Sequence, residues 1–284
     1  MKAAPVQSRT ALVTGCSTGI GLAAARLLRE RGWTVWPTAR KPDDLARLRA
    51  EGFDPIELDL HDPASVRRAA EEALKRGGGR LGALVNNAGY GQPGAVEDLT
   101  REALRRQFEV NLFGLHELTA HVLPALREQG YGRIVNVSSV LGRLTIPFMG
   151  AYCASKHALE ALSDALRIEL LGTGVAVSIV EPGPIETAFR KNAFESGQEH
   201  LDLDRSRFGE RYASEGKRRA AKNFRSSDPF TAPPEAVARR IVHAVESSSP
   251  RRRYPVTLPA RAGSILARLL PHAVMDWLLA RRLG

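Results

Sequence analysis

The sequence is poor in the features that cross-link, anchor or export a protein. Its 284 residues include only two cysteines, so we expect no disulfide framework and a reducing cytoplasm as the compartment. No apolar run reaches the ~20 residues that a membrane-spanning helix needs, and residues 1–10 lack the apolar stretch of a signal peptide. With 43% hydrophobic and 25% charged residues, the composition is typical of a soluble globular protein.

Acidic residues are the scarcer charged type, with 31 against 41 basic residues and a net charge of +10. The basic residues are spread along the chain, and no nucleic-acid-binding motif accompanies them. We therefore expect no nucleic-acid partner and interpret the excess as a solvated basic face that also attracts an anionic dinucleotide. His116, His121 and His157 do not form a metal-binding set, so we expect no catalytic metal.

Short apolar runs alternate with segments of helical periodicity between residues 10 and 180. We predict strands at 10–14, 34–39, 56–60, 81–86, 132–138 and 175–180, and helices at 22–31, 64–76, 101–129 and 151–171. This alternation is typical of a parallel sheet with helices on both faces, and nearly continuous apolar runs suit strands covered on both sides. The predicted fold is a single α/β domain with a Rossmann-like, doubly wound sheet of about seven strands.

The pattern changes after Pro182. We predict a cofactor-binding and catalytic core at 10–187, a polar insertion bordering the substrate at 188–232, and C-terminal helices with a last strand at 233–284. The tail from residue 263 is amphipathic, and its apolar residues are Leu266, Leu269, Leu270, Val274, Trp277 and Leu278. We expect this face to pack on the core or against a second subunit, in preference to a membrane surface.

A glycine-rich turn follows the first predicted strand and reads TGCSTGIG over residues 14–21. Glycines let the backbone come close to a pyrophosphate, and the helix that follows offers free N–H groups and the positive end of its dipole. The alternative is a tight turn that binds nothing. The TGxxxGxG spacing resembles the short-chain dehydrogenase/reductase family, and the resemblance extends over residues 10–189. It implies an oxidoreductase whose dinucleotide is held by Gly15, Ser17, Thr18, Gly19, Ile20 and Gly21.

The end of the second predicted strand indicates which dinucleotide to expect. It reads Thr38-Ala39-Arg40 and lacks the acidic residue that binds a ribose 2′-hydroxyl. The Arg40 guanidinium matches a 2′-phosphate instead, and the family pattern also associates this arginine with NADP. Thr18 stands where many NADP-preferring relatives carry a basic residue, so we expect a preference for NADP(H) over NAD(H) that is modest. The alternative for Arg40 is a surface residue that starts a loop.

Further segments match cofactor-binding motifs of the family. By resemblance, Asp59 and Leu60 contact the adenine ring. The motif Asn87, Ala88 and Gly89 supports the central sheet and the cofactor. The nicotinamide end is contacted by the segment with Pro182, Gly183 and Thr187. These segments end strands, and ligands bind such sheets at the carboxyl ends of strands. Taken alone, Asn87 is also consistent with a turn and Asp59 with a helix cap.

Tyr152 and Lys156 are four residues apart on a predicted helix, so they share a face. A tyrosine has a usual pKa of about 10, and a nearby ammonium is expected to lower it, so that the phenol exchanges a proton near neutral pH. The segment YCASK resembles the catalytic motif of the family, whose lysine also binds the nicotinamide ribose. Cys153 and Cys16 lack the partner residues of a nucleophile, and we interpret both as packing residues.

The resemblance also implies a catalytic serine and asparagine. The serine of the family precedes the tyrosine by 13 residues, which selects Ser139 over Ser138 to orient the substrate oxygen. Asn111 matches an asparagine that holds a water on the proton path to the lysine, although alone it is consistent with an ordinary polar helix residue. The expected reaction is hydride transfer between nicotinamide and a carbonyl or alcohol, with Tyr152 as the proton donor.

The segments 139–160 and 178–189 resemble the retinol and 17β-hydroxysteroid dehydrogenase members of the family, which implies a bulky, apolar alcohol or ketone. The residues expected to wall its pocket, with the insertion, are Leu141, Ile146, Phe148 and Met149. The family also implies a homo-oligomer. The alternative function is a non-catalytic NADP(H) sensor or scaffold, against which the complete set of Asn, Ser, Tyr and Lys argues.

Overall fold

The computed structural model describes residues 3–189, 193, 201, 206–212, 214 and 230–280. The strands are β1 (Thr10–Val13), β2 (Thr34–Ala39), β3 (Ile56–Glu57), β4 (Ala83–Asn86), β5 (Gly132–Val137), β6 (Val175–Glu181) and β7 (Arg253–Pro255). The α-helices are α1 (Gly19–Glu30), α2 (Pro42–Ala50), α3 (Pro63–Arg76), α4 (Arg101–Phe108), α5 (Gly114–Glu128), α6 (Gly150–Glu169), α9 (Pro234–Glu246), α10 (Leu258–Leu269) and α11 (His272–Ala280). Shorter helical segments are η1 (Val96–Asp98), the π-helical η2 (Glu109–Phe113) and η3 (Val140–Gly142).

The seven described strands form one parallel sheet in the order β3-β2-β1-β4-β5-β6-β7. The chain builds outward from β1 to β3, then returns to place β4 on the other side of β1. This reversal is where doubly wound sheets bind ligands, at the carboxyl ends of their strands. The predicted Rossmann-like single domain is confirmed.

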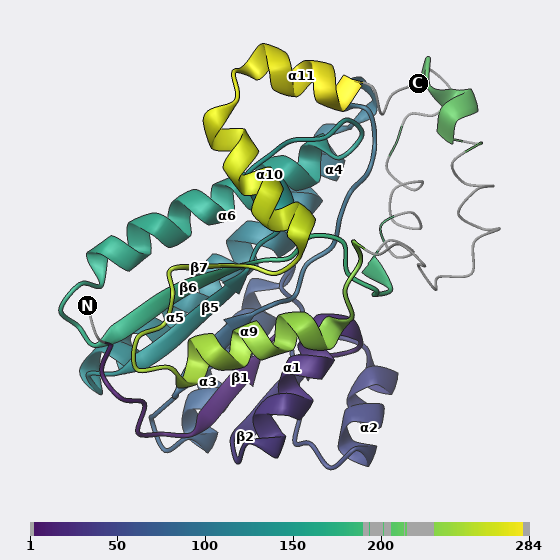
Figure 1. The fold of residues 1–284 in the computed structure, drawn as a ribbon. Helices are drawn as coiled ribbons and strands as arrows, with labels where there is room; N and C mark the ends of the chain where they lie inside the picture. Colours follow the sequence, from purple (N-terminus) through teal and green to yellow (C-terminus); the bar gives the residue numbers. More distant parts are fainter. Residues whose placement is uncertain are drawn as a thin grey trace.

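Helices cover both faces of the sheet. Successive side chains of a strand point to opposite faces, so Ala11 and Val13 of β1 pack with α1 and α9, whereas Leu12 packs with α3 and α5. Figure 1 shows α1 and α9 in front of the sheet. Each strand thus has apolar cover on both sides, which explains why the strands are apolar at nearly every position.

The structure corrects three local predictions. The helix predicted at 101–129 is interrupted by η2, a π-helical segment of the kind often found at functional sites. The strand predicted at 56–60 ends at Glu57, because Asp59 accepts a hydrogen bond from the backbone N–H of His61 and turns the chain toward α3. Helix α2 is absent from the sequence analysis, although Pro42 and two aspartates in the first turn are typical of a helix start.

The amphipathic tail forms α10 and α11, shown in yellow at the top of Figure 1. Only Ala260 of α10 is buried, and α11 has no buried residue. Of the two expected arrangements, α11 therefore does not show burial in the core of its own chain, and packing against a second subunit stays a prediction. No described helix is both long and apolar enough to cross a membrane. Most of the predicted insertion at 188–232 lies outside the described residues.

Candidate functional site

The glycine turn lies at the carboxyl end of β1, beside the reversal of strand order. Gly15 and Gly19 have positive φ angles of 71° and 62°, a left-handed conformation that glycine adopts without strain. A side chain at Gly21 would place its Cβ 2.3 Å from the carbonyl oxygen of Gly15. Helix α1 therefore begins directly against the turn, which only glycine at position 21 permits.

The start of α1 fits a phosphate group. Thr18 occupies the N-cap position, but its side chain makes no capping hydrogen bond. The first backbone N–H groups of a helix lack partners within the helix, and this N-terminus leaves them uncapped by Thr18. The residues of the turn are thus arranged to hold a dinucleotide pyrophosphate through backbone N–H groups.

Asn87 and Ala88 hold the turn in place. The Asn87 Nδ2 donates to the carbonyl oxygens of Thr14, at 2.9 Å, and Gly15, at 3.1 Å. The Thr14 hydroxyl in turn accepts from the backbone N–H groups of Asn87 and Ala88. The predicted motif at 87–89 therefore lies against the glycine turn, with the Asn87 side chain directed at protein backbone.

Arg40 follows β2 and is exposed, which leaves its guanidinium accessible. A second arginine, Arg47 of α2, donates to the Ser17 carbonyl oxygen at 2.5 Å and pairs with Asp44 at 2.7 Å. Arg47 is not among the predicted site residues, because its helix α2 is not predicted from the sequence. Asp59 accepts from His61 N–H through one carboxylate oxygen, whereas the cap of α3 is Asp62, so the alternative of a helix cap does not hold for Asp59.

The segment after β6 closes the site from the other side. The Cβ that Gly19 lacks would lie 3.1 Å from Thr187 Cγ2, so Thr187 contacts the start of α1. The Pro182 carbonyl oxygen accepts from Val140 N–H at 2.9 Å. Gly183 packs against Thr257, which caps α10. Thr187, predicted at the nicotinamide end, is thus brought against the glycine turn predicted to hold the pyrophosphate.

The four candidate catalytic residues are buried and converge beside β5. Ser139 follows β5, and its Oγ accepts from Leu141 N–H as the cap of η3. Its side chain also lies near enough to the Tyr152 hydroxyl to favour the phenolate. Lys156 Nζ lies 5.8 Å from the centre of the Tyr152 ring and donates to the Val137 carbonyl oxygen at 2.9 Å. Serine, tyrosine and lysine thus meet at the carboxyl end of one central strand.

Burial dominates the electrostatics of this pair. It raises the pKa of Tyr152 to about 12, against the lowering effect of the Ser139 hydrogen bond. It lowers the pKa of Lys156 to about 8, and the charge of Glu160 opposes that change. The pKa of Tyr152 thus moves in the direction opposite to the expected lowering, because the loss of water around the phenol is the largest effect on it.

Asn111 lies in η2 and its side chain is fully engaged. Its Nδ2 donates to the Tyr90 carbonyl oxygen at 2.9 Å and to Ser155 Oγ at 3.2 Å, while its Oδ1 accepts from Tyr90 N–H at 3.0 Å. The side chain therefore joins the segment after Gly89 to α6. Because the side-chain amide of Asn111 already makes these hydrogen bonds, a water on a proton path would hydrogen-bond the backbone of Asn111 instead.

Aromatic rings line one side of the candidate cleft. Phe189 stacks at a tilt on Tyr152, with ring centres 5.3 Å apart. Phe148 has a positive φ of 62°, which is strained for a bulky residue, and meets Phe208 edge-on at 5.1 Å. The Tyr212 hydroxyl donates to Asp98 at 2.6 Å, which fixes this part of the insertion. The sequence analysis predicts Phe148 as a wall and misses the other rings.

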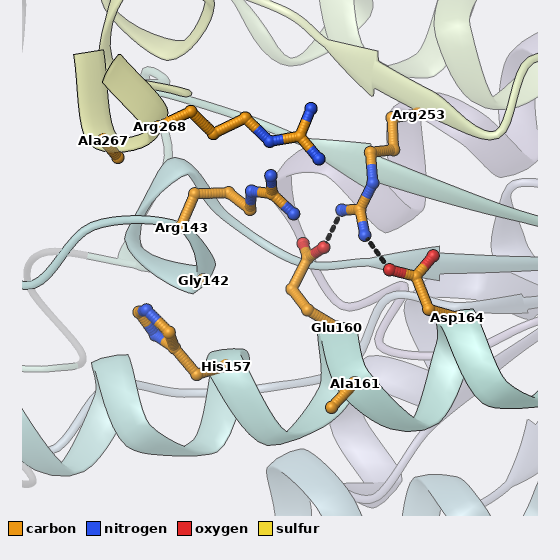
Figure 2. Close-up of a pocket in the computed structure, with 9 residues that line it drawn as sticks. All are labelled: Gly142, Arg143, His157, Glu160, Ala161, Asp164, Arg253, Ala267 and Arg268. Carbon is orange, nitrogen blue, oxygen red and sulfur yellow. Dashed lines mark hydrogen bonds and ion pairs between the residues drawn. The ribbon is translucent and has the colours of Figure 1, made fainter. Parts of the chain in front are cut away.

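A cavity of about 310 Å³ lies elsewhere along α6, between η3, β7 and α10. Figure 2 shows Arg143, Arg253 and Arg268 converging on it, with Glu160 and Asp164 pointing up from α6. Arg253 forms ion pairs with Glu160, with Asp164 and with the buried Glu181 of β6. Three carboxylates thus balance three guanidinium groups, and the cluster ties α6 to β6 and β7.

Both cysteines are buried and free. Burial raises the pKa of the Cys16 thiol to about 12 and also raises that of Cys153. A thiol acts as a nucleophile through its thiolate, so these shifts agree with the interpretation of both residues as packing groups.

Comparison with known proteins completes the description of the site. Residues 9–198 match the family model described as short chain dehydrogenase. The chain is 42% identical over 274 residues to the uncharacterized oxidoreductase YbbO of Escherichia coli strain K12, covering 96% of this chain and 95% of that one. It is 34% identical to an NADPH-dependent 3-dehydrocapnine reductase of Ornithobacterium rhinotracheale, covering 94% of this chain and 95% of that one.

Among solved structures, the fold is similar to that of a short-chain dehydrogenase from Burkholderia cenocepacia in complex with NADP. The TM-score is 0.73 at 25% identity, covering 98% of this chain and 99% of that one. With the glycine turn, the serine, tyrosine and lysine at β5 and the parallel sheet in the same chain, these matches give one conclusion. The chain belongs to the short-chain dehydrogenase/reductase family of NAD(P)-dependent oxidoreductases.

Proposed function

We propose that this protein interconverts a carbonyl and an alcohol on a bulky, apolar substrate with NADP(H) as its cofactor. The observation that carries the proposal is the convergence of Ser139, Tyr152 and Lys156, which are all buried, with Lys156 one turn after Tyr152 on α6. These residues lie at the carboxyl end of β5, and the glycine turn lies at the same edge of the sheet, after β1.

In this proposal Tyr152 is the proton donor for carbonyl reduction. Because burial raises its pKa to about 12, the phenol is protonated at neutral pH, as a general acid must be. Ser139 orients the substrate oxygen through its hydroxyl, which lies at the carboxyl end of β5. The Lys156 ammonium stabilises the phenolate that remains after proton transfer, and its buried position directs its charge into the site. When bound, the nicotinamide supplies or accepts the hydride.

The preference for NADP(H) is assigned to Arg40. Its exposed guanidinium follows a strand that ends in no acidic residue, which suits a 2′-phosphate. The similar reductase named as NADPH-dependent and the similar structure in complex with NADP support the same cofactor. The uncapped N-terminus of α1 is assigned to the pyrophosphate and Thr187 to the nicotinamide end. Asp59 and Leu60 remain our candidates for the adenine end.

The substrate class is assigned from the walls of the cleft. Phe189 lies against Tyr152, and Phe148 and Phe208 pack edge-on against each other, with the guanidinium groups of Arg211 and Arg207 over their outer rings. Such walls favour an apolar ligand with few polar groups. We also expect a homo-oligomer, as the family implies. The expected compartment is the cytoplasm, in agreement with two unpaired cysteines.

The test is cofactor oxidation measured by absorbance, with NADPH and NADH against a panel of steroid, retinoid, aliphatic and aromatic carbonyls. We expect turnover with NADPH on apolar members of the panel. Tyr152→Phe should keep NADPH affinity within about twofold and lower kcat by at least about a hundredfold, since general acid catalysis contributes that much. NADPH binding without turnover on any member would contradict the enzyme and favour a sensor.

A further inference from the structure

The two C-terminal helices expose a large part of the apolar surface of the described residues. The most exposed are Leu269 and Leu258, at 73% and 66%, followed by Ile265 at 57% and Trp277 at 54%. Soluble monomers rarely leave many large apolar side chains together in water. This surface, which we call the hairpin face, comprises Leu258, Ile265, Leu266, Leu269, Val274, Trp277 and Leu278.

Among the described residues, the hairpin face is anchored by burial at the start of α10. Thr257 caps α10 by accepting from Ala260 N–H, and Ala260 is buried. Gly263 then lies against Leu144 and Val140, so closely that a Cβ there would come within 2.7 Å of Leu144. Beyond this point nothing in α10 is buried, and seven of the nine residues of α11 are apolar although none is buried. The helices are therefore not part of the hydrophobic core.

The charge around the hairpin face selects its partner. Residues 258–284 carry four arginines against a single acidic residue, Asp276, and the whole chain has a net charge of +10. In a symmetric dimer through this face, each copy would bring Arg261 and Arg268 toward the same residues of the other. A second copy is thus opposed by like charge, whereas an anionic surface is attracted.

We propose that the hairpin face docks on the surface of an anionic lipid bilayer, with α10 and α11 lying in the interface. A helix with leucine and tryptophan on its apolar side and arginine at its margins is typical of interfacial binding. Tryptophan has an apolar ring and a polar N–H, which suits the boundary between acyl chains and headgroups. The anchoring end at Ala260 stays with the protein, so docking requires no unfolding of the core.

The test uses co-sedimentation of the full chain with vesicles of phosphatidylcholine, with and without phosphatidylserine. We expect binding to the vesicles that contain phosphatidylserine, and weaker binding to phosphatidylcholine alone or at high salt. The double variant Ile265→Glu with Leu269→Glu should lower the affinity for these vesicles at least about tenfold, because it removes apolar area that the bilayer would bury and adds negative charge.

A matched control is Ile168→Glu on α6. Ile168 is 56% exposed, close to the 57% of Ile265, and lies outside the hairpin face. It should leave vesicle affinity unchanged. Equal binding of the control and the hairpin variant, or no binding of the native chain, would overturn the proposal. A vesicle-free oligomer, seen by light scattering and dissociated only by the hairpin variant, would overturn it in favour of a second copy.

Discussion

Lys156 and Glu160 are one helical turn apart, and both are buried. Burial lowers the Lys156 pKa to about 8, although the negative charge of Glu160 opposes that shift. Burial also raises the pKa of Glu160, which Arg253 counteracts. Glu160, which pairs with Arg253, therefore raises the pKa of the candidate catalytic lysine through its charge, without contact with the substrate. We regard Glu160 as a positioning residue.

This arrangement predicts a pH effect. Glu160→Gln should lower the Lys156 pKa further, so the lysine loses its proton at a lower pH. The alkaline limb of the kcat/KM profile should then move down by about one pH unit, measured in the direction of carbonyl reduction. Asp164→Asn is the control, because Asp164 also pairs with Arg253 but lies two turns from Lys156. An unmoved alkaline limb in Glu160→Gln would rule out this role.

A second prediction at the residue scale concerns the cofactor. Arg40→Asp removes the guanidinium assigned to the 2′-phosphate and adds a repelling charge. It should raise the KM for NADPH at least about tenfold, since a charge-assisted hydrogen bond is worth about 1.5–3 kcal/mol. NADH should be affected little. Arg49→Asp, on the exposed end of α2, makes the same change in net charge and should leave both constants unchanged. Equal losses for the two cofactors would disprove the assignment.

At the scale of elements, the join between the glycine turn and α1 is a close contact of backbone with backbone in the candidate cofactor site. Gly21→Ala should push α1 away from the Gly15 carbonyl and lower NADPH affinity, with a loss of stability of about 1–3 kcal/mol from overpacking. Gly32→Ala is the control: its Cβ would meet nothing, but its φ of 80° is strained for alanine. That variant should lose stability and keep NADPH affinity, as measured by fluorescence titration and chemical unfolding.

Elements were predictable from the sequence where they obeyed one periodicity. The apolar strands and α6 are such cases, and the motifs TGxxxGxG and YCASK indicate the candidate site residues on them. Helix α2 is short and polar, with only Leu45 and Leu48 buried, so its periodicity is weak. The π-turn at Asn111 cannot be predicted from periodicity, because it depends on the hydrogen bonds of its side chain to Tyr90 and Ser155.

At the scale of the whole molecule, the cluster around Arg253 joins three elements that are distant in sequence. Arg253→Met should lower the free energy of unfolding by about 3 kcal/mol, because it leaves three carboxylates without their shared partner. The neighbouring Arg252 is exposed, and Arg252→Met should be nearly neutral. Urea unfolding of both variants measures the difference, and equal stability would show that the ion pairs contribute nothing net.

No local pattern predicts this cluster, since its members come from α6, β6 and β7 and meet only in the folded chain. The pKa of Tyr152 is a similar case. Spacing placed Lys156 beside it correctly, but the sequence does not report how completely the phenol is buried. The partner of the tail is likewise not given by the sequence, because an amphipathic pattern predicts that one face is covered without indicating which surface covers it.

Gly263 of α10 rests on Val140 and Leu144, and Val140 opens the short helix that Ser139 caps. One layer of packed side chains thus separates the outermost helices from the hydroxyl assigned to the substrate oxygen. A substitution in the tail can therefore tilt that serine without altering any residue that lines the cleft. We therefore expect substitutions in the C-terminal helices to change which substrates are accepted while the candidate catalytic residues stay the same.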